Sequence, residues 1–171
     1  LKWGGKERRY AAQKFFIYTF TASVVMLLGL ITVYFLQDPA LAGDNAGDFT
    51  GRSFDLVALT SIANDVHANG GIFLGKTMQS VLFVMLMLGF LVKLPAAPFH
   101  TWLPDAHVQA PTGGSMLLAG VMLKMGAYGM FRIPIALFPH AVETFQFAIM
   151  LFGFVSLVYG AIVCLGQTNL K

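Results

Sequence analysis

The sequence has few charged residues and almost no cysteine. Only 11% of its 171 residues are Asp, Glu, Lys or Arg, whereas soluble domains carry roughly 25%. The single cysteine, Cys164, excludes a disulfide within the chain and a metal cluster held by several cysteines. The net charge of +3 is small and gives no indication of nucleic acid binding. These scarcities exclude a soluble globular domain and a disulfide-stabilised scaffold.

Long apolar runs are what the sequence has in abundance. Hydrophobic residues make up 57% of the chain, and the mean hydropathy is +0.71. Four runs reach the ~20 residues that a membrane-crossing helix needs: residues 14–36, 76–103, 112–138 and 143–166. None alternates in the manner of an outer-membrane strand. The sequence predicts one all-α, polytopic transmembrane helix bundle over residues 1–171, with one proline-broken helix and an extramembrane connection at 37–75.

The charges around the first run differ in sign. The basic residues of the N-terminal flank are Lys2, Lys6, Arg8, Arg9 and Lys14, whereas the connection carries five aspartates against Arg52 alone. Since Lys and Arg accumulate on the cytoplasmic, matrix or stromal side, we expect the N-terminal end there. Residues 54–59 could form a short interfacial helix. The sequence has no initiator methionine, no signal peptide and no polar C-terminal tail, so we expect it to be a piece of a longer polypeptide.

Two lysines lie inside apolar runs on either side of a turn. Lys93 and Lys124 are 31 positions apart, and their midpoint falls in the turn near Val108. Each lysine is about 12 residues from its end of the turn, which corresponds to about 18 Å of helix. In an antiparallel hairpin both therefore lie near the middle of the bilayer. Ionisable groups at that depth are costly and are usually functional.

Two histidines and two prolines extend this pattern. His100 and His107 follow Lys93 at intervals of seven residues, nearly two helical turns. Pro95 and Pro98 break the helix and free carbonyl groups, for which we expect water to be the partner. A lysine beside hydrated backbone can change its protonation state, and histidine titrates near neutrality. The pattern predicts a proton path through these residues and Lys124, with His107 the least certain member.

Simpler roles stay open for several polar residues. His100 and Trp102 could be interfacial anchors, and His107 could simply be solvated in the turn. Asp105 could cap the turn or hold His107, and we expect the cap. Small residues at the start of the third run should allow close helix packing, namely Gly113, Gly114, Ser115 and Ala119, whereas Gly126 and Gly129 give no signal of their own.

The stretch VKLPAAPFHTWLPDAHVQAPT, followed by MLLAGVMLKMGAYGMFR, resembles the antiporter-like membrane subunits of respiratory complex I and its photosynthetic relative. Within that family the resemblance is to the chain 4, or M, type. It extends over nearly all of the chain except 38–75. It implies that Lys93 lies on a broken seventh helix and Lys124 on the eighth, with His100 carrying protons onward. It also implies that the glutamate partner of Lys93 precedes Leu1 and that a second half-channel follows Lys171.

The resemblance implies a function as well. It is that of a proton-translocating membrane-arm subunit of an NADH, or ferredoxin/NAD(P)H, quinone oxidoreductase. Flavin, iron–sulfur clusters and quinone are then expected in partner subunits, with no cofactor or metal in this chain. The expected partners are the lipid bilayer and other membrane-arm subunits. The resemblance favours a bacterial inner membrane or a cyanobacterial thylakoid over a mitochondrial inner membrane or a plastid thylakoid.

Two other function classes compete with this one. The first is a subunit of a multi-subunit cation/proton antiporter or of a membrane-bound hydrogenase, because related subunits share part of the motif. The second is a haem-binding electron-transfer subunit, which needs paired histidines at matching depths of two helices. Only His100 approaches membrane depth, so the sequence argues against haem.

Overall fold

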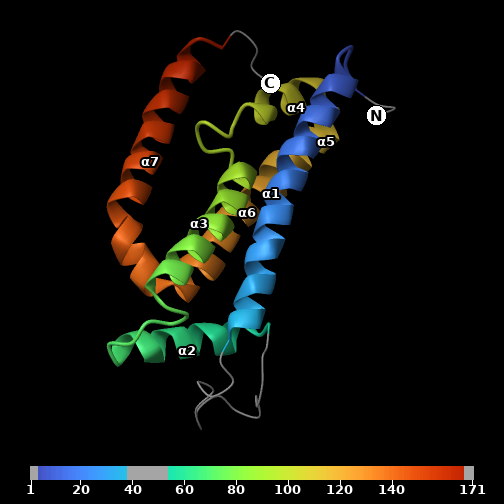
Figure 1. Ribbon diagram of the computed structural model, residues 1–171. Helices are drawn as coiled ribbons and strands as arrows, with labels where there is room; N and C mark the ends of the chain where they lie inside the picture. Colours follow the sequence, from blue (N-terminus) through green and yellow to red (C-terminus); the bar gives the residue numbers. More distant parts are fainter. Residues whose placement is uncertain (1–3, 38–53, 168–171) are drawn as a thin grey trace.

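The computed structural model describes residues 4–37 and 54–167, and within these ranges all regular structure is helical (Figure 1). Four stretches of the described chain are long and apolar enough to cross a membrane: α1 Arg8–Leu36, α3 Lys76–Lys93, the joined helices Thr112–Ile135, and α7 Pro139–Leu165. The prediction of an all-α, polytopic transmembrane bundle is confirmed. Some of the charged residues on which the predicted orientation depends lie outside the described residues, namely Lys2, Asp38, Asp44, Asp48 and Arg52.

α1 and α3 pack side by side and antiparallel (Figure 1). α1 carries hydroxyl side chains within an apolar sequence, and those of Thr19, Ser23 and Thr32 donate hydrogen bonds to carbonyls one turn earlier. Bonds of this kind let polar side chains remain in an apolar helix. α3 lies at the centre of the molecule, with Leu82, Phe83 and Leu86 in the core. The buried core is therefore built around α3.

α3 ends at Lys93, ten residues before the expected end of the second run at 103. Pro95 has no N–H to continue the ladder, and the next helix, α4 Trp102–Gln109, begins after an irregular segment. The predicted proline break is confirmed. The carbonyl of Leu91 accepts a hydrogen bond from the Ala96 amide at 3.1 Å, so protein backbone takes the place of the expected water there.

The third span is continuous but not a regular α-helix. It runs through α5 Thr112–Leu117, η2 Leu118–Met122, α6 Leu123–Met130 and η3 Phe131–Ile135, of which η2 and η3 are single turns of π-helix. Pro134 lies inside η3, and its missing N–H is a sufficient cause for the widened turn. No sequence signal predicted η2, which directly precedes the helix that carries Lys124.

Close helix packing occurs at glycines other than the expected ones. A Cβ on Gly126 would lie 3.2 Å from the Lys93 Cβ, and a Cβ on Gly129 would overlap the Phe90 ring. A Cβ on Gly113 would meet nothing within 4 Å, and one on Gly114 only its own preceding turn. Within the described residues no neighbouring helix therefore packs closely at Gly113 or Gly114, and the prediction for Ser115 and Ala119 stays a prediction. Gly126 and Gly129 allow the third span to lie directly against α3.

α2 Leu56–Ala68 lies across the end of the bundle opposite to the start of α1 (Figure 1). Its N-cap is Asp55, whose side chain accepts a hydrogen bond from the Val57 amide at 2.9 Å. The helix expected near residues 54–59 is confirmed and is longer than predicted. His67 near its end lies 3.4 Å from Glu143 at the start of α7, so an exposed ion pair joins α2 to α7 at this end.

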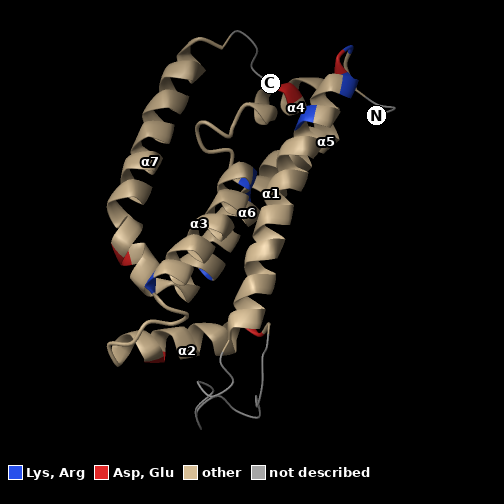
Figure 2. Ribbon diagram, viewed as in Figure 1, with Lys and Arg blue, Asp and Glu red and all other residues tan. Residues whose placement is uncertain are grey.

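Charged residues lie at both ends of the bundle, and Lys93 at the end of α3 lies between them (Figure 2). The basic N-terminal part of α1 and the short helix α4 lie at one end, and α2 lies at the other (Figures 1 and 2). This is the arrangement expected when the second and third spans form a hairpin whose turn returns to the basic side. The predicted sidedness relative to a membrane remains a prediction.

Candidate functional site

Lys93 is the last residue of α3 and is half-buried. Its side chain lines a groove of about 430 Å³ between α1, α3 and the third span, whose lining residues are Phe15, Phe16, Thr19, Phe20, Ser23, Lys93, Trp102, Met122 and Met125. Lys93 is the one charged residue of this lining. Ser23 lies next to the midpoint of the 29-residue helix α1. Lys93 therefore lies level with the middle of a membrane-spanning helix.

The groove offers Lys93 hydroxyl groups but no carboxylate. Within residues 4–37 and 54–167, Lys93 has neither an ion pair nor a hydrogen bond of its side chain. Thr19 and Ser23 donate their protons to backbone carbonyls, so their oxygen lone pairs remain able to accept from an ammonium group or a water molecule. The local chemistry suits a cation that is solvated by a few neutral oxygens.

Lys124 lies on α6 and is exposed in this chain. The backbone of Gly126 touches Lys93, and two residues along a helix is only about 3 Å of rise. The two lysines are therefore at nearly the same level. The step of two residues from Lys124 to Gly126 is also a rotation of about 200° around the helix. Lys124 therefore points away from α3 and does not share the groove of Lys93.

His100 lies in the irregular segment between α3 and α4 and is half-buried. Its ring contacts Tyr159 of α7 edge-on, with centroids 5.1 Å apart and an interplanar angle of 67°. Its Nδ1 atom is buried and has no hydrogen-bond partner within the described part of the chain. His100 thus connects the break in the second span to α7.

His107 lies on α4 and forms a hydrogen bond through Nδ1 with the hydroxyl of Ser115 on α5. It is neither free in solvent nor held by Asp105. Asp105 instead pairs with Lys14 of α1, at 2.7 Å between Nζ and Oδ2. The expectation that Asp105 caps the turn was wrong, because Asp105 lies in the first turn of α4 and its partner is 91 residues away.

The seven-residue spacing does not produce a single stripe. Lys93 faces the groove beside α1, His100 faces α7, and His107 faces α5. The break after Lys93 redirects each residue to a different neighbour. No cluster of three or more potential metal-ligating side chains forms among the described residues. The Lys14–Asp105 pair was not predicted from the sequence, although Asp105 is the only acidic residue between Asp65 and Glu143.

Comparison with known proteins gives a consistent family. Residues 1–171 match the family model described as "NADH:quinone oxidoreductase/Mrp antiporter, TM". The chain is 43% identical over 99% of its length to NADH-quinone oxidoreductase subunit M of Rhodobacter capsulatus. It is 39% identical to subunit M of Rickettsia conorii and 38% identical to NAD(P)H-quinone oxidoreductase chain 4 of Gloeobacter violaceus, again over 99% of its length.

The chain spans only 31%, 30% and 28% of these three relatives respectively. The similarity is therefore complete for this chain and partial for each relative. The family model nevertheless covers every residue of the sequence, including those that carry the proline break and both lysines. The chain belongs to the NADH:quinone oxidoreductase/Mrp antiporter transmembrane family, in which it is similar to subunit M, or chain 4.

Proposed function

We propose that this chain supplies part of a proton half-channel in the membrane arm of an NADH, or ferredoxin/NAD(P)H, quinone oxidoreductase. The relatives named above are quinone oxidoreductase subunits, and the chain is similar to them over 99% of its length. Redox chemistry would take place in other subunits, which would hold flavin, iron–sulfur clusters and quinone. This chain would move protons and bind no cofactor. Its membrane would be a bacterial inner membrane or a cyanobacterial thylakoid.

The placement of Lys93 is the observation that carries the proposal. It ends a broken helix, level with the middle of α1, in a groove whose other lining residues are uncharged. An ammonium group is costly within an apolar membrane span and is usually functional there. The hydroxyl oxygens of Thr19 and Ser23 give the charged form and any entering water a place to bond.

The other residues of the proposed path lie around the third span. Lys124 would receive or release protons at the same level, on the side of α6 that points away from α3. In this role it faces parts of the full-length protein outside the present chain. His100 and His107 would connect the path to the basic end through the broken segment and α4, since imidazole both accepts and donates protons near neutral pH.

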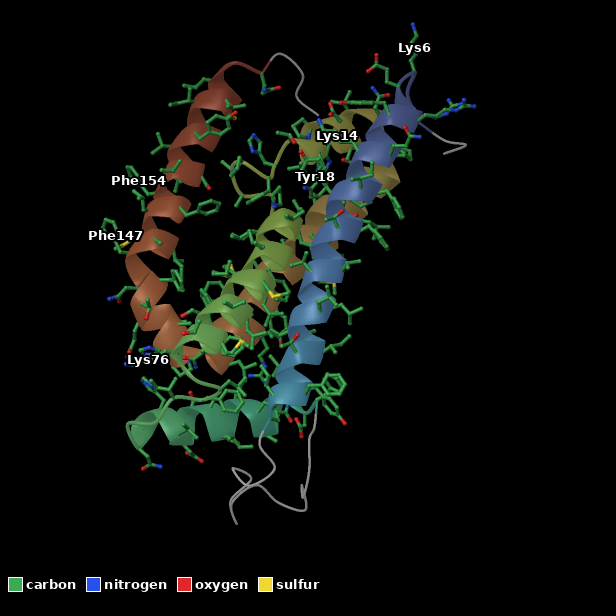
Figure 3. All side chains as sticks on the ribbon, viewed as in Figure 1. Lys6, Lys14, Tyr18, Lys76, Phe147 and Phe154 are labelled. Atoms are coloured by element: carbon green, nitrogen blue, oxygen red, sulfur yellow. The ribbon has the colours of Figure 1, made fainter. Side chains whose placement is uncertain are left out.

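The test removes one charge from the full-length protein in its intact complex. The variant Lys124→Met should abolish or sharply reduce proton pumping in sealed vesicles during NADH oxidation by a quinone, measured with a pH-sensitive dye. Lys76→Met is a matched control, because Lys76 is an exposed lysine at the start of α3 (Figure 3). An unchanged ratio of protons to electrons in the Lys124 variant would refute the proposal.

A second function is a subunit of a cation/proton antiporter complex without redox partners. The description of the matched family includes the Mrp antiporter, which keeps this candidate open. Sodium-dependent proton exchange by a purified complex that lacks iron–sulfur subunits would favour it. Co-purification of the full-length protein with iron–sulfur subunits would eliminate it.

A further inference from the structure

The N-terminal half of α1 holds the segment 101–109 through three contacts, and Gly5, just before α1, adds a fourth. The hydroxyl of Thr101 donates to the Tyr18 oxygen at 3.1 Å. The rings of Trp102 and Phe15 lie 5.3 Å apart. Lys14 pairs with Asp105 at 2.7 Å, and the Gly5 amide donates to the Gln109 carbonyl at 3.1 Å. As α1 is followed toward its start, the contacted residues advance along α4, so the two elements run antiparallel.

Asp105 and His107 occupy opposite sides of α4. They are two residues apart, which is a rotation of about 200° on a helix, and the contacts agree with this. Asp105 reaches Lys14 on α1, whereas His107 reaches Ser115 on α5. α4 is therefore held between α1 and α5 by one polar contact on each side. Its rotation about its own axis decides whether His107 meets Ser115.

We propose that Lys14 and Asp105 are a positioning pair, which fixes the rotation of α4 so that His107 stays bonded to Ser115. This inference rests on the proposed proton path, because it gives the pair a role only if His107 belongs to that path. Neither residue carries the proton in this scheme. Both act through α4 and therefore through the imidazole that α4 presents to α5.

The start of α4 and the position of Asp105 are held by separate contacts. Trp102 anchors the first residue of α4, since its indole Nε1–H donates to the Val92 carbonyl at 3.1 Å. Asp105 lies about one turn further along, and its carboxylate is the first acidic group that α4 offers to α1. Lys14 also lies over the Tyr10 ring, 5.8 Å from its centroid. These contacts hold the ammonium group of Lys14 in one place.

The ion pair between Lys14 and Asp105 is partly exposed to solvent. The side chains of Lys14 and Asp105 are 22% and 40% exposed, so water weakens their attraction. Figure 3 shows Lys14 on the side of α1 that faces the rest of the molecule, whereas Lys6 points away into solvent. Lys6 is therefore a suitable control, because it carries the same charge at the same end of the molecule but is exposed and points away from α4.

The experiment uses the full-length protein in its intact complex and measures the ratio of protons pumped to electrons transferred. Lys14→Met and Asp105→Asn should each lower proton pumping by up to about fivefold, the largest equilibrium factor typical of a partly exposed ion pair. Lys14→Arg should retain pumping, because the positive charge is conserved. The reversed pair, Lys14→Asp with Asp105→Lys, should restore most of the loss. Lys6→Met should behave as wild type.

Recovery of pumping in the reversed pair distinguishes a positioning role of Lys14 and Asp105 from a general effect on folding. A complex that assembles in normal amounts but pumps poorly in both single variants, and recovers in the reversed pair, supports the proposal. Equal losses in the single variants and the reversed pair would overturn it, as would normal pumping in both single variants. If Lys124→Met stops pumping while the Lys14 variants pump normally, only the positioning role fails. If Lys124→Met also pumps normally, the proton path itself fails.

Discussion

Replacing Trp102 tests how the broken segment is held against α3. Trp102 is 2% exposed, and its indole N–H donates to the Val92 carbonyl one residue before the end of α3. The ring also packs against Phe15 of α1 at a centroid distance of 5.3 Å. The variant Trp102→Phe keeps most of the apolar volume and removes the hydrogen bond, whereas Trp102→Ala removes both. The two variants therefore separate bonding from packing.

The expected magnitudes follow from these contacts. Trp102→Phe leaves the buried Val92 carbonyl without its side-chain donor, which should cost about 1–3 kcal/mol in the free energy of unfolding. Trp102→Ala also opens a large cavity and should cost about 3–5 kcal/mol in total. Because Trp102 lines the groove of Lys93, the alanine variant should widen that groove. Proton pumping should then fall more in the alanine variant than in the phenylalanine variant.

Stability is measured by heating the full-length protein in detergent and monitoring the loss of its helical circular dichroism signal. Proton pumping is measured separately in vesicles. The free energy of unfolding should be highest in the wild type, lower in Trp102→Phe and lowest in Trp102→Ala. If the phenylalanine variant is as stable as wild type, the hydrogen bond to Val92 does not hold the segment. If the alanine variant is also unaffected, the packing of the broken segment described above is wrong.

Two further predictions concern packing and surface charge, and both are read from the same unfolding assay. Gly129→Ala should destabilise the protein by about 1–3 kcal/mol, since the new Cβ would overlap the ring of the buried Phe90. Gly113→Ala should not change the free energy of unfolding, because the space at its Cβ is open. Equal losses of stability in the two variants would contradict the contact between Gly129 and Phe90. Glu143→Gln should cost less than about 1 kcal/mol, because its pair with His67 is exposed, and a larger loss that persists in high salt would show that the pair is stronger than its geometry indicates.

The shared level of the two lysines could be predicted from the sequence, because helical rise is fixed and a hairpin is symmetric about its turn. Counting residues from Val108 places Lys93 and Lys124 at one level, and the contact between Lys93 and Gly126 agrees with this. The four spans and the break at Pro95 were also predictable, since apolar length and the missing proline N–H act locally. These features depend on neighbours in the sequence alone.

The direction of each side chain could not be predicted in the same way. Lys124 points away from α3 because Gly126 provides the contact with α3, and no periodicity in the sequence marks Gly126 rather than Gly113. The Lys14–Asp105 pair joins residues 91 positions apart, so only the packed structure shows it. His100 and His107 differ in their neighbours because the irregular segment after Lys93 changes the direction of the chain.

The π-helical turn at Leu118–Met122 makes the length of the third span part of the site. A turn closed by i→i+5 bonds contains about one residue more than an α-helical turn, so the span from Ser115 to Lys124 rotates by about 100° less than a regular helix with the same number of residues. Ser115, the partner of His107, lies before this turn, and Lys124 lies after it. Removing one residue from η2 would let the span become a regular helix in which Ser115 and Lys124 keep their present relative directions, whereas a regular helix of unchanged length would turn Lys124 by about 100° relative to Ser115. Their relative angle is thus encoded by a residue count, without any side chain that specifies it.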